Sequence, residues 1–153
     1  PASMFTPGRI GIISRSGTLS YEVAGYINEA GFGESTMVGI GGDSVRGTDV
    51  QVVLEKFNED PNTDMVVLVG EIGGVLEEDA AHYIKNMNKP VISYIAGQTA
   101  PKGRRMGHAG AIITGKRGTV ESKKEVLRDC GAVIADKISE IPNIIADIYN
   151  QRK

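Results

Sequence analysis

The stretch Met65-Val-Val-Leu-Val-Gly-Glu-Ile-Gly-Gly74 decides the fold of this 153-residue chain. Its first five residues are all apolar, which is typical of a strand buried on both faces of a parallel sheet. A glycine-rich turn follows the strand directly and carries one carboxylate, Glu71. Open α/β sheets bind ligands in the loops that follow the carboxyl ends of their strands. The stretch therefore predicts a buried strand that leads into a binding loop.

Four more apolar runs lie on either side of this strand, and segments with helical spacing separate them. We predict the other strands at residues 9–14, 35–40, 91–96 and 132–135. The helices are expected at 19–30, 50–57, 76–87, 119–130 and 138–148. This alternation is typical of an α/β fold with helices on both faces of the sheet. Our first choice is a flavodoxin-like, doubly wound parallel sheet of five strands in the order 2-1-3-4-5.

The composition is that of a globular protein and argues against several functions. The hydrophobic share of 41% and the charged share of 24% allow one ordinary core in one domain. A net charge of −2, with no basic stripe among aromatic residues, argues against nucleic acid as a partner. No apolar run is long enough to span a membrane. The single cysteine, Cys130, cannot form an internal disulfide and fits a reducing compartment.

A long loop follows the strand predicted at 91–96 and reads Ala100-Pro-Lys-Gly-Arg-Arg-Met-Gly-His-Ala-Gly-Ala-Ile-Ile-Thr-Gly115. A loop of this length is usually functional or disordered, and the apolar residues at 111–113 favour order. His108 lies between small residues, and a neutral imidazole is a good nucleophile. The alternative is a hydrogen-bonded structural histidine. The cations Lys102, Arg104 and Arg105 form either a solvated face or a contact for an anionic ligand or partner.

The loops that follow the strands, at 14–18, 41–43, 70–74 and 98–110, are expected to converge at one edge of the sheet. This convergence would bring Glu71 towards His108, although 37 positions separate them in the sequence. A carboxylate that accepts a hydrogen bond from one imidazole nitrogen fixes the tautomer and leaves the other nitrogen free to attack. The alternative for Glu71 is an acid that only stabilises its turn.

The segment Ser16-Gly17-Thr18 opens a predicted helix directly after a buried strand. Free backbone N–H groups, two hydroxyls and the positive end of the helix dipole would attract an anion there. Ordinary capping of the helix explains the same residues, with Ser16 as the N-cap and Gly31 beyond the other end.

Other familiar motifs are absent or incomplete. No G-x-G-x-x-G follows the first strand, which argues against a dinucleotide site of that kind. The segment from Gly110 to Lys116 matches most of a P-loop, but Arg117 occupies the position of the magnesium-binding Ser or Thr. No metal-ligand cluster is evident, so no metal residue is predicted. His82 is expected on a helix surface, and Cys130 in packing.

Four motifs, in order along nearly the whole chain, resemble those of the α subunit of succinyl-CoA synthetase. They are Ser14-Arg-Ser-Gly-Thr18, Gly39-Ile-Gly-Gly-Asp43, Gly70-Glu-Ile-Gly-Gly74 and Ala100-Pro-Lys-Gly-Arg-Arg-Met-Gly-His-Ala-Gly-Ala-Ile-Ile113. The resemblance implies that His108 becomes transiently phosphorylated and that Glu71 is hydrogen-bonded to it. It also implies that Ser16-Gly17-Thr18 begins a phosphate-binding helix and that Tyr21 lies beside the bound carboxylic acid.

The family reaction is succinate + CoA + NTP ⇌ succinyl-CoA + NDP + phosphate, through phosphohistidine and then an acyl phosphate. The resemblance implies an acid–thiol ligase in which CoA, ATP or GTP, and Mg²⁺ serve the assembled enzyme. This chain alone is expected to bind none of these three tightly. Phosphate is the one ligand that we expect it could hold. Malate–CoA ligase or another acyl-CoA synthetase α subunit is an alternative within the same class. A non-catalytic flavodoxin-like module that binds an anion or a partner is the alternative from another class.

The resemblance also suggests a division of the chain and its partners. Residues 1–7 are similar to the join after a CoA-binding domain, so we expect a residual linker at 1–7 and a ligase-CoA domain at 8–153. The expected partners are that N-terminal CoA-binding domain, succinate and a β subunit of the ATP-grasp type. The expected location is the cytoplasm of a bacterium or archaeon, or the mitochondrial matrix of a eukaryote.

Overall fold

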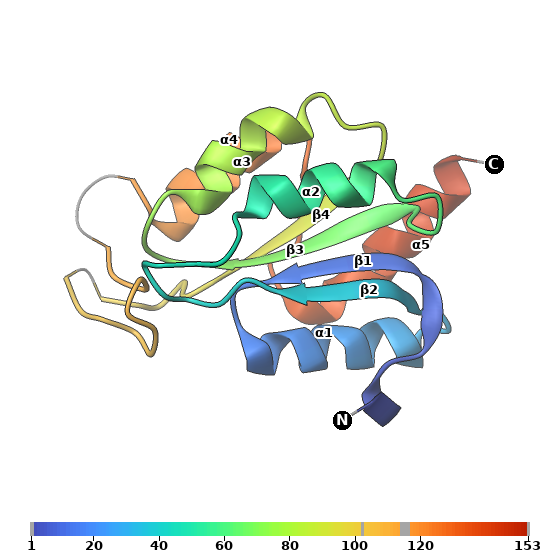
Figure 1. The fold of residues 1–153 in the computed structure, drawn as a ribbon, viewed down its shortest axis with the longest axis horizontal. Helices are drawn as coiled ribbons and strands as arrows, with labels where there is room; N and C mark the ends of the chain where they lie inside the picture. Colours follow the sequence, from blue (N-terminus) through green and yellow to red (C-terminus); the bar gives the residue numbers. More distant parts are fainter. Residues whose placement is uncertain (1, 102, 114–116, 153) are drawn as a thin grey trace.

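The computed structural model describes residues 2–101, 103–113 and 117–152, which form one parallel sheet between two layers of helices (Figure 1). The strands are β1 (Pro7–Ser14), β2 (Glu34–Gly39), β3 (Met65–Glu71), β4 (Val91–Ala96) and β5 (Val133–Ile134). They pair in the order β2-β1-β3-β4-β5, and all four pairings are parallel. The predicted flavodoxin-like α/β fold with the strand order 2-1-3-4-5 is confirmed.

Strand β3 lies at the centre of the sheet, as its apolar sequence predicts. All seven of its residues are buried. Val67 is opposite Ile12 of β1 on one side and opposite Ile92 of β4 on the other. The strand extends past the predicted end at Val69 to Glu71, because the ladder with β4 continues to Ala96. Glu71 is therefore held by the sheet itself.

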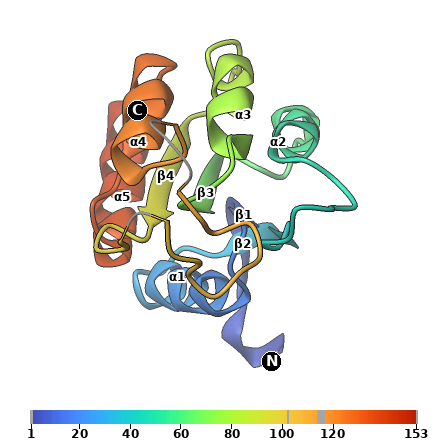
Figure 2. The ribbon, with the colours of Figure 1, turned by 90° about the vertical axis from the view of Figure 1, so that its left-hand side faces the viewer.

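Five helices cover the two faces of the sheet. They are α1 (Gly17–Glu29), α2 (Val50–Glu59), α3 (Leu76–Ile84), α4 (Val120–Asp129) and α5 (Ile141–Gln151). Figure 1 and Figure 2 show α2, α3 and α4 on one face and α1 and α5 on the other. Each face has its own core: Leu54 and Leu127 belong to the first, and Val23 and Ile145 belong to the second. Burial on both faces explains the continuous apolar strands.

Two helix ends differ from the predicted ends for identifiable reasons. The helix expected to reach Met87 ends at Ile84, because the amide of Met87 bonds to the Ile84 carbonyl, three residues back, and closes a tight turn before Pro90. The last helix begins at Ile141, after a short 3₁₀ turn at Ile138–Glu140. Pro142 fits the first turn of that helix, where a missing N–H costs nothing.

The predicted caps of α1 are present. The Ser16 hydroxyl accepts a hydrogen bond from the Leu19 amide at 3.2 Å. Gly31 follows the helix with a φ of +82°, a conformation that strongly favours glycine. Helix α4 begins in the same way, since the Thr119 side chain accepts from the Ser122 amide at 3.0 Å.

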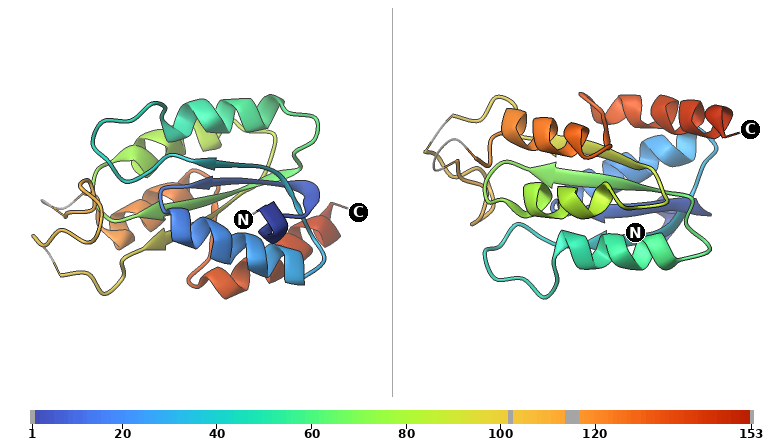
Figure 3. Two further views of the ribbon diagram at one scale, coloured as in Figure 1. Left: turned by 60° about the horizontal axis from the view of Figure 1, so that its bottom comes forward. Right: turned by 90° about the horizontal axis from the view of Figure 1, so that it is seen from above.

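The loops that follow β1, β3 and β4 lie at one end of the molecule, called here the carboxyl edge. Beyond this edge extends the described part of the long loop, residues 97–101 and 103–113 (Figures 1 and 3). A short 3₁₀ turn at Ala2–Met4 precedes β1. None of the helices in the described ranges has the length and apolarity to cross a membrane.

Two glycine substitutions test how closely β1 packs on its neighbours. A Cβ at Gly8 would lie 2.2 Å from the carbonyl carbon of Gly33, whereas a Cβ at Gly25 would meet no atom within 4 Å. We expect Gly8→Ala to lower the free energy of unfolding by about 1–3 kcal/mol. Gly25→Ala, inside α1, should raise it by about 0.5–1 kcal/mol. Urea unfolding followed by circular dichroism measures both, and effects of the same sign would contradict this packing.

Candidate functional site

The centre of the carboxyl edge is a pair formed by His108 and Glu71. The Nδ1 atom of His108 lies 2.7 Å from Oε2 of Glu71. A carboxylate oxygen can only accept, so Nδ1 carries the proton of this hydrogen bond, and in the neutral ring Nε2 keeps its lone pair. The Glu71 side chain is 9% exposed, and that of His108 is 40% exposed. One ring nitrogen is thus fixed by the protein, while the ring itself remains accessible.

The backbone of glycine residues packs directly against His108 and the loop that carries it. A Cβ at Gly42 would lie 2.1 Å from Nδ1 of the imidazole, so no side chain fits there. The amide of Gly110 donates to the Gly42 carbonyl at 2.8 Å. On the other side, a Cβ at Gly73 would lie 2.1 Å from the Gly110 carbonyl oxygen. The loop that carries His108 therefore rests directly on the turns after β2 and β3.

Beneath the pair lies a group of four charged residues, Arg15, Glu71, Glu77 and Lys123, called here the buried ion cluster. Arg15 pairs with Oε1 of Glu71 at 3.0 Å and with Glu77 at 3.1 Å. Lys123 pairs with Oε2 of the same Glu77 carboxylate. Lys123 also donates to the carbonyl oxygens of Glu71 and Gly73, both at 2.8 Å. The cluster fixes both the side chain and the backbone of Glu71.

Three members of the buried ion cluster are almost inaccessible to solvent. Arg15 is 2% exposed, and Glu77 and Lys123 are 0% exposed. Burial by itself would raise the pKa of the Glu77 carboxyl, but the charges of Lys123 and Arg15 outweigh burial and hold that pKa below its usual range. Glu77 is therefore an anion inside the protein, shared between two cations.

Sequence reasoning missed Arg15, Glu77 and Lys123, although helical spacing carried a signal for two of them. Lys123 lies three residues after Val120 and four before Leu127, which are both buried, so it occupies the buried stripe of α4. Glu77 shares the buried face of α3 with alanines and an isoleucine. Charges at such positions are rarely buried unless they are paired.

The other predicted site residues lie on α1. Gly17 and Thr18 are exposed in its first turn, where backbone N–H groups have no acceptor within the helix. Tyr21 is 37% exposed, and its ring centroid lies 5.8 Å from that of Phe5. Among the described residues, no hydrogen bond or ion pair joins this segment to His108. The chain places it immediately after Arg15 at the same edge.

The remaining candidates take no part in this pair. Arg104 and Arg105 are exposed, and His82 is exposed on α3 as predicted. Cys130 is half-buried at the end of α4, where it packs against the apolar core. Lys102 and the end of the rejected P-loop motif, Gly115 and Lys116, lie outside the described residues.

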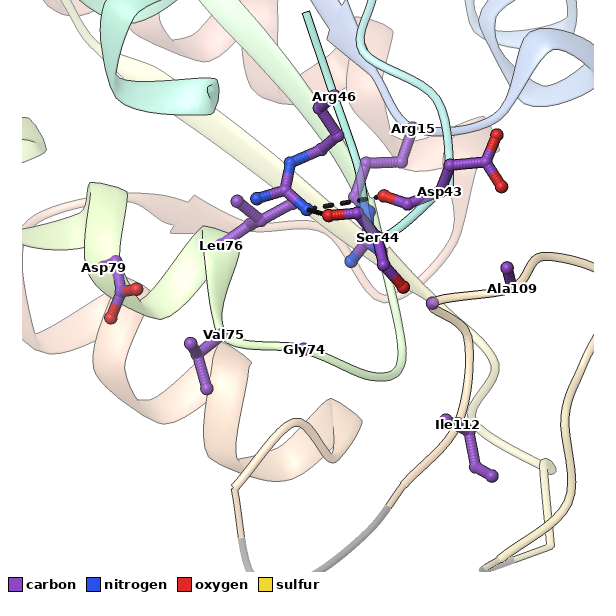
Figure 4. A pocket seen from close by; sticks show the side chains of 11 residues that line it. Arg15, Asp43, Ser44, Arg46, Gly74, Val75, Leu76, Asp79, Ala109 and Ile112 are labelled. Atoms are coloured by element: carbon purple, nitrogen blue, oxygen red, sulfur yellow. Dashed lines mark hydrogen bonds between the residues drawn. The ribbon is translucent and has the colours of Figure 1, made fainter. Parts of the chain in front are cut away.

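A cavity of about 370 Å³ lies between the start of α3 and the loop at residues 109–112, and Arg15 of the buried ion cluster is among its lining residues. Figure 4 shows Val75 and Leu76 on one side of it, and Asp43 and Ser44 on another. Arg46 reaches it too, but its guanidinium donates to the Ser44 carbonyl at 3.0 Å and pairs with Asp49. The buried Arg15 lines its wall, so the cavity shares a wall with the buried ion cluster.

The fold and the site together define a doubly wound α/β domain with a histidine–carboxylate pair at the carboxyl edge of its sheet. Residues 13–133 match the CoA-ligase family, and the chain belongs to this family.

This chain is highly similar in sequence to several named proteins, but the aligned region covers only part of each of them. The chain is 60% identical over 141 residues to the succinate–CoA ligase [ADP-forming] subunit alpha of Methanothermobacter thermautotrophicus, covering 92% of this chain and 48% of that subunit. It is 52% identical over 149 residues to the subunit of the same name from Aquifex aeolicus, covering 97% and 49%. The chain thus spans about half the length of the curated relatives it matches.

Solved structures show the same architecture. ATP citrate lyase from Methanosaeta concilii, in complex with (3S)-citryl-CoA, superposes with a TM-score of 0.88 at 25% identity, covering 95% of this chain and 24% of that one. Acetyl-coenzyme A synthetase 1 from Ca. Korarchaeum cryptofilum gives a TM-score of 0.62 at 24% identity, over 87% and 28% of the two chains. The second likeness concerns the fold alone.

The lowered pKa of Glu77 predicts a loss of stability in acid. The ionised carboxylate stabilises the fold above its pKa in the unfolded chain, about 4.3, and this contribution is lost as pH falls through the lower folded pKa. Glu77→Gln should lower the free energy of unfolding at pH 7 by about 3–5 kcal/mol, because it leaves Lys123 buried with its charge uncompensated. Its stability should then depend less on pH below 5.

Denaturant titrations from pH 7 to pH 3 measure this dependence. Glu22→Gln, which changes an exposed carboxylate on α1, is the matched control and should leave the profile unchanged. Parallel profiles for the wild type and Glu77→Gln would show that Glu77 does not carry the acid sensitivity.

The close packing of Gly42 against the imidazole of His108 can be tested with Gly42→Ala. The added Cβ would overlap the imidazole, so the ring should leave Glu71 and lose the hydrogen bond at Nδ1. Gly39→Ala is the control, because a Cβ there meets nothing within 4 Å. Nitrogen chemical shifts of the two histidine rings report the change, with the exposed His82 as an internal reference. An unaltered His108 signal in folded Gly42→Ala would disprove the close approach.

Proposed function

We propose that this chain is the histidine-bearing part of the α subunit of an ADP-forming succinate–CoA ligase. The observation that carries the proposal is the 2.7 Å contact between His108 Nδ1 and Glu71, on an otherwise accessible ring. A neutral imidazole with one nitrogen fixed and the other free is suited to accept and pass on a phosphoryl group. The identity of 52–60% to subunits of that name supports the proposal.

In the proposed reaction, Nε2 of His108 attacks the terminal phosphorus of ATP, the bond to the bridging oxygen breaks, and ADP leaves. Glu71 stabilises the positive charge that develops on the ring. A carboxylate oxygen of succinate then attacks the phosphorus, which restores the imidazole and forms an acyl phosphate. Finally the thiol of CoA attacks the acyl carbon, and phosphate leaves. The protein mainly positions groups and stabilises charge in such transfers.

We propose that the start of α1 holds the phosphate during these steps. The exposed amides of Gly17 and Thr18 and the helix dipole attract an anion, even though the Ser16 hydroxyl already caps the helix. Tyr21, four residues after Gly17, lies one turn further along α1. The family resemblance supports placing it beside the carboxylic acid.

The substrates and partners are proposed from the relatives. Their names favour succinate over malate and ATP over GTP, and they imply a second subunit. We propose a β subunit of the ATP-grasp type and a CoA-binding domain that precedes residues 8–153, with residues 1–7 as its linker. Within the described ranges, no group of three or more His, Cys, Asp or Glu side chains could hold a metal. We propose that Mg²⁺ accompanies the nucleotide on the partner subunit. The proposed location is the cytoplasm of a bacterium or archaeon, the sources of these relatives.

Phosphate labelling tests the nucleophile. The α subunit, its β partner, Mg²⁺ and γ-labelled ATP should give label on the protein that is labile to acid and stable to alkali. His108→Asn should abolish this label and keep the fold, whereas His82→Asn, the control, should label normally. Equal labelling of His108→Asn would disprove the assignment of His108, and an unlabelled wild type would favour a non-catalytic module.

The same assay tests Glu71. Glu71→Gln keeps the shape of the side chain but loses the charge that stabilises the ring during transfer. We expect the labelling rate to fall by about 100-fold or more, as for other groups aimed at developing charge. An unchanged rate would mean that Glu71 only stabilises its turn.

A further inference from the structure

We propose that Arg15 is a positioning residue, which holds Glu71 in the orientation that fixes the tautomer of His108. The catalytic consequence rests on the proposed function, whereas the effect on the tautomer does not. Neither the apolar pattern of β1 nor any motif in the sequence assigns such a role to Arg15.

The two oxygens of Glu71 have separate partners. Oε2 accepts from His108 Nδ1 at 2.7 Å, and Oε1 pairs with Nη2 of Arg15 at 3.0 Å. Without Arg15, the carboxylate could rotate about its own side-chain bonds, because nothing else among the described contacts holds Oε1. The ring would then lose the fixed acceptor that selects one tautomer. The position of the carboxylate therefore depends on Arg15.

Arg15 is itself immobilised. Its Nη1 donates to Glu77 at 3.1 Å and to the Gly73 carbonyl at 3.1 Å, and the residue is 2% exposed. It also lies against the turn that follows His108, since a Cβ at Gly110 would be 3.4 Å from Nη2. Figure 4 shows Arg15 between the turn at Gly74 and the loop at Ala109. One guanidinium thus connects β1, the end of β3, α3 and the histidine loop.

The charges of the buried ion cluster leave Arg15 available to pair with Glu71. Glu77 has a second cation, Lys123, and therefore does not depend on Arg15 alone. The planar guanidinium directs Nη1 as a donor to Glu77 and brings Nη2 into an ion pair with Oε1 of Glu71, which a lysine ammonium in the same place cannot do with the same geometry. Both cations donate to the Gly73 carbonyl, but among the described contacts only Arg15 pairs with the carboxylate of Glu71. This pairing distinguishes Arg15 from Lys123.

The test measures the tautomer of His108 by nitrogen NMR in Arg15→Met and Arg15→Lys. In the wild type, His108 should be almost entirely the tautomer with the proton on Nδ1. Arg15→Met should shift it towards the mixture shown by the exposed His82, and Arg15→Lys should lie between. Arg9→Met, which removes an exposed arginine at the opposite end of β1, is the matched control and should leave His108 unchanged.

The assembled enzyme provides the kinetic readout. Arg15→Met should lower the labelling rate of His108 about 10- to 100-fold, the range found for outer partners that orient metal-bound histidines. In the Glu71→Gln background it should cause almost no further loss, because residues that act through one another are not additive. Independent, multiplicative losses would overturn the proposal.

An unchanged tautomer in folded Arg15→Met would also overturn it, whatever the rates. If Arg15→Met does not fold, Arg15→Lys decides, and a wild-type tautomer in that variant counts against the proposal. A wild type that is never labelled would instead disprove the proposed function, while the tautomer measurement would still decide the role of Arg15.

Discussion

The carboxyl edge depends on one anion, Glu77, which is buried between Arg15 and Lys123. Burial of ions costs several kcal/mol each and is offset only when every charge finds good partners. Here the partners come from different elements: Arg15 follows β1, Glu77 lies in the first turn of α3 and Lys123 belongs to α4. The charges are therefore satisfied only when both helices have docked on the sheet. This requirement couples formation of the site to completion of the fold.

That coupling fixes the position of a site that is built from loops. Loops are normally more mobile than the elements they join. In this protein, Lys123 ties the carbonyls of Glu71 and Gly73, and the loop that carries His108 contacts two glycines with no room for a side chain. Glycine at positions 42 and 73 is thus a packing requirement. The backbone that surrounds the imidazole is set by close contacts and by buried charge together.

Much of the fold was predictable because its signals are local. The apolar run of β3, the capping serine before α1 and the glycine after it each follow from the residues themselves. The meeting of Glu71 with His108 followed from one topological rule about parallel strands. The burial of Arg15 was not predictable, because a charged residue in the loop after a strand is normally exposed to solvent. Its burial depends on Glu77 and on Glu71, far away in the sequence, which no local pattern reveals.

The fold by itself does not define the chemistry. A lyase at 25% identity shares it with a TM-score of 0.88, over 95% of this chain and 24% of the lyase chain, so the fold does not distinguish the two. The histidine loop has two unlike flanks: Ala111 and Ile113 are buried, whereas Met106 and Gly107 are exposed. The buried flank and the ion cluster fix Nδ1, and the exposed flank leaves the ring open to reacting partners. The proposed transfer of phosphate by His108 needs these two properties at once, because orientation requires contact with the protein and transfer requires access from outside.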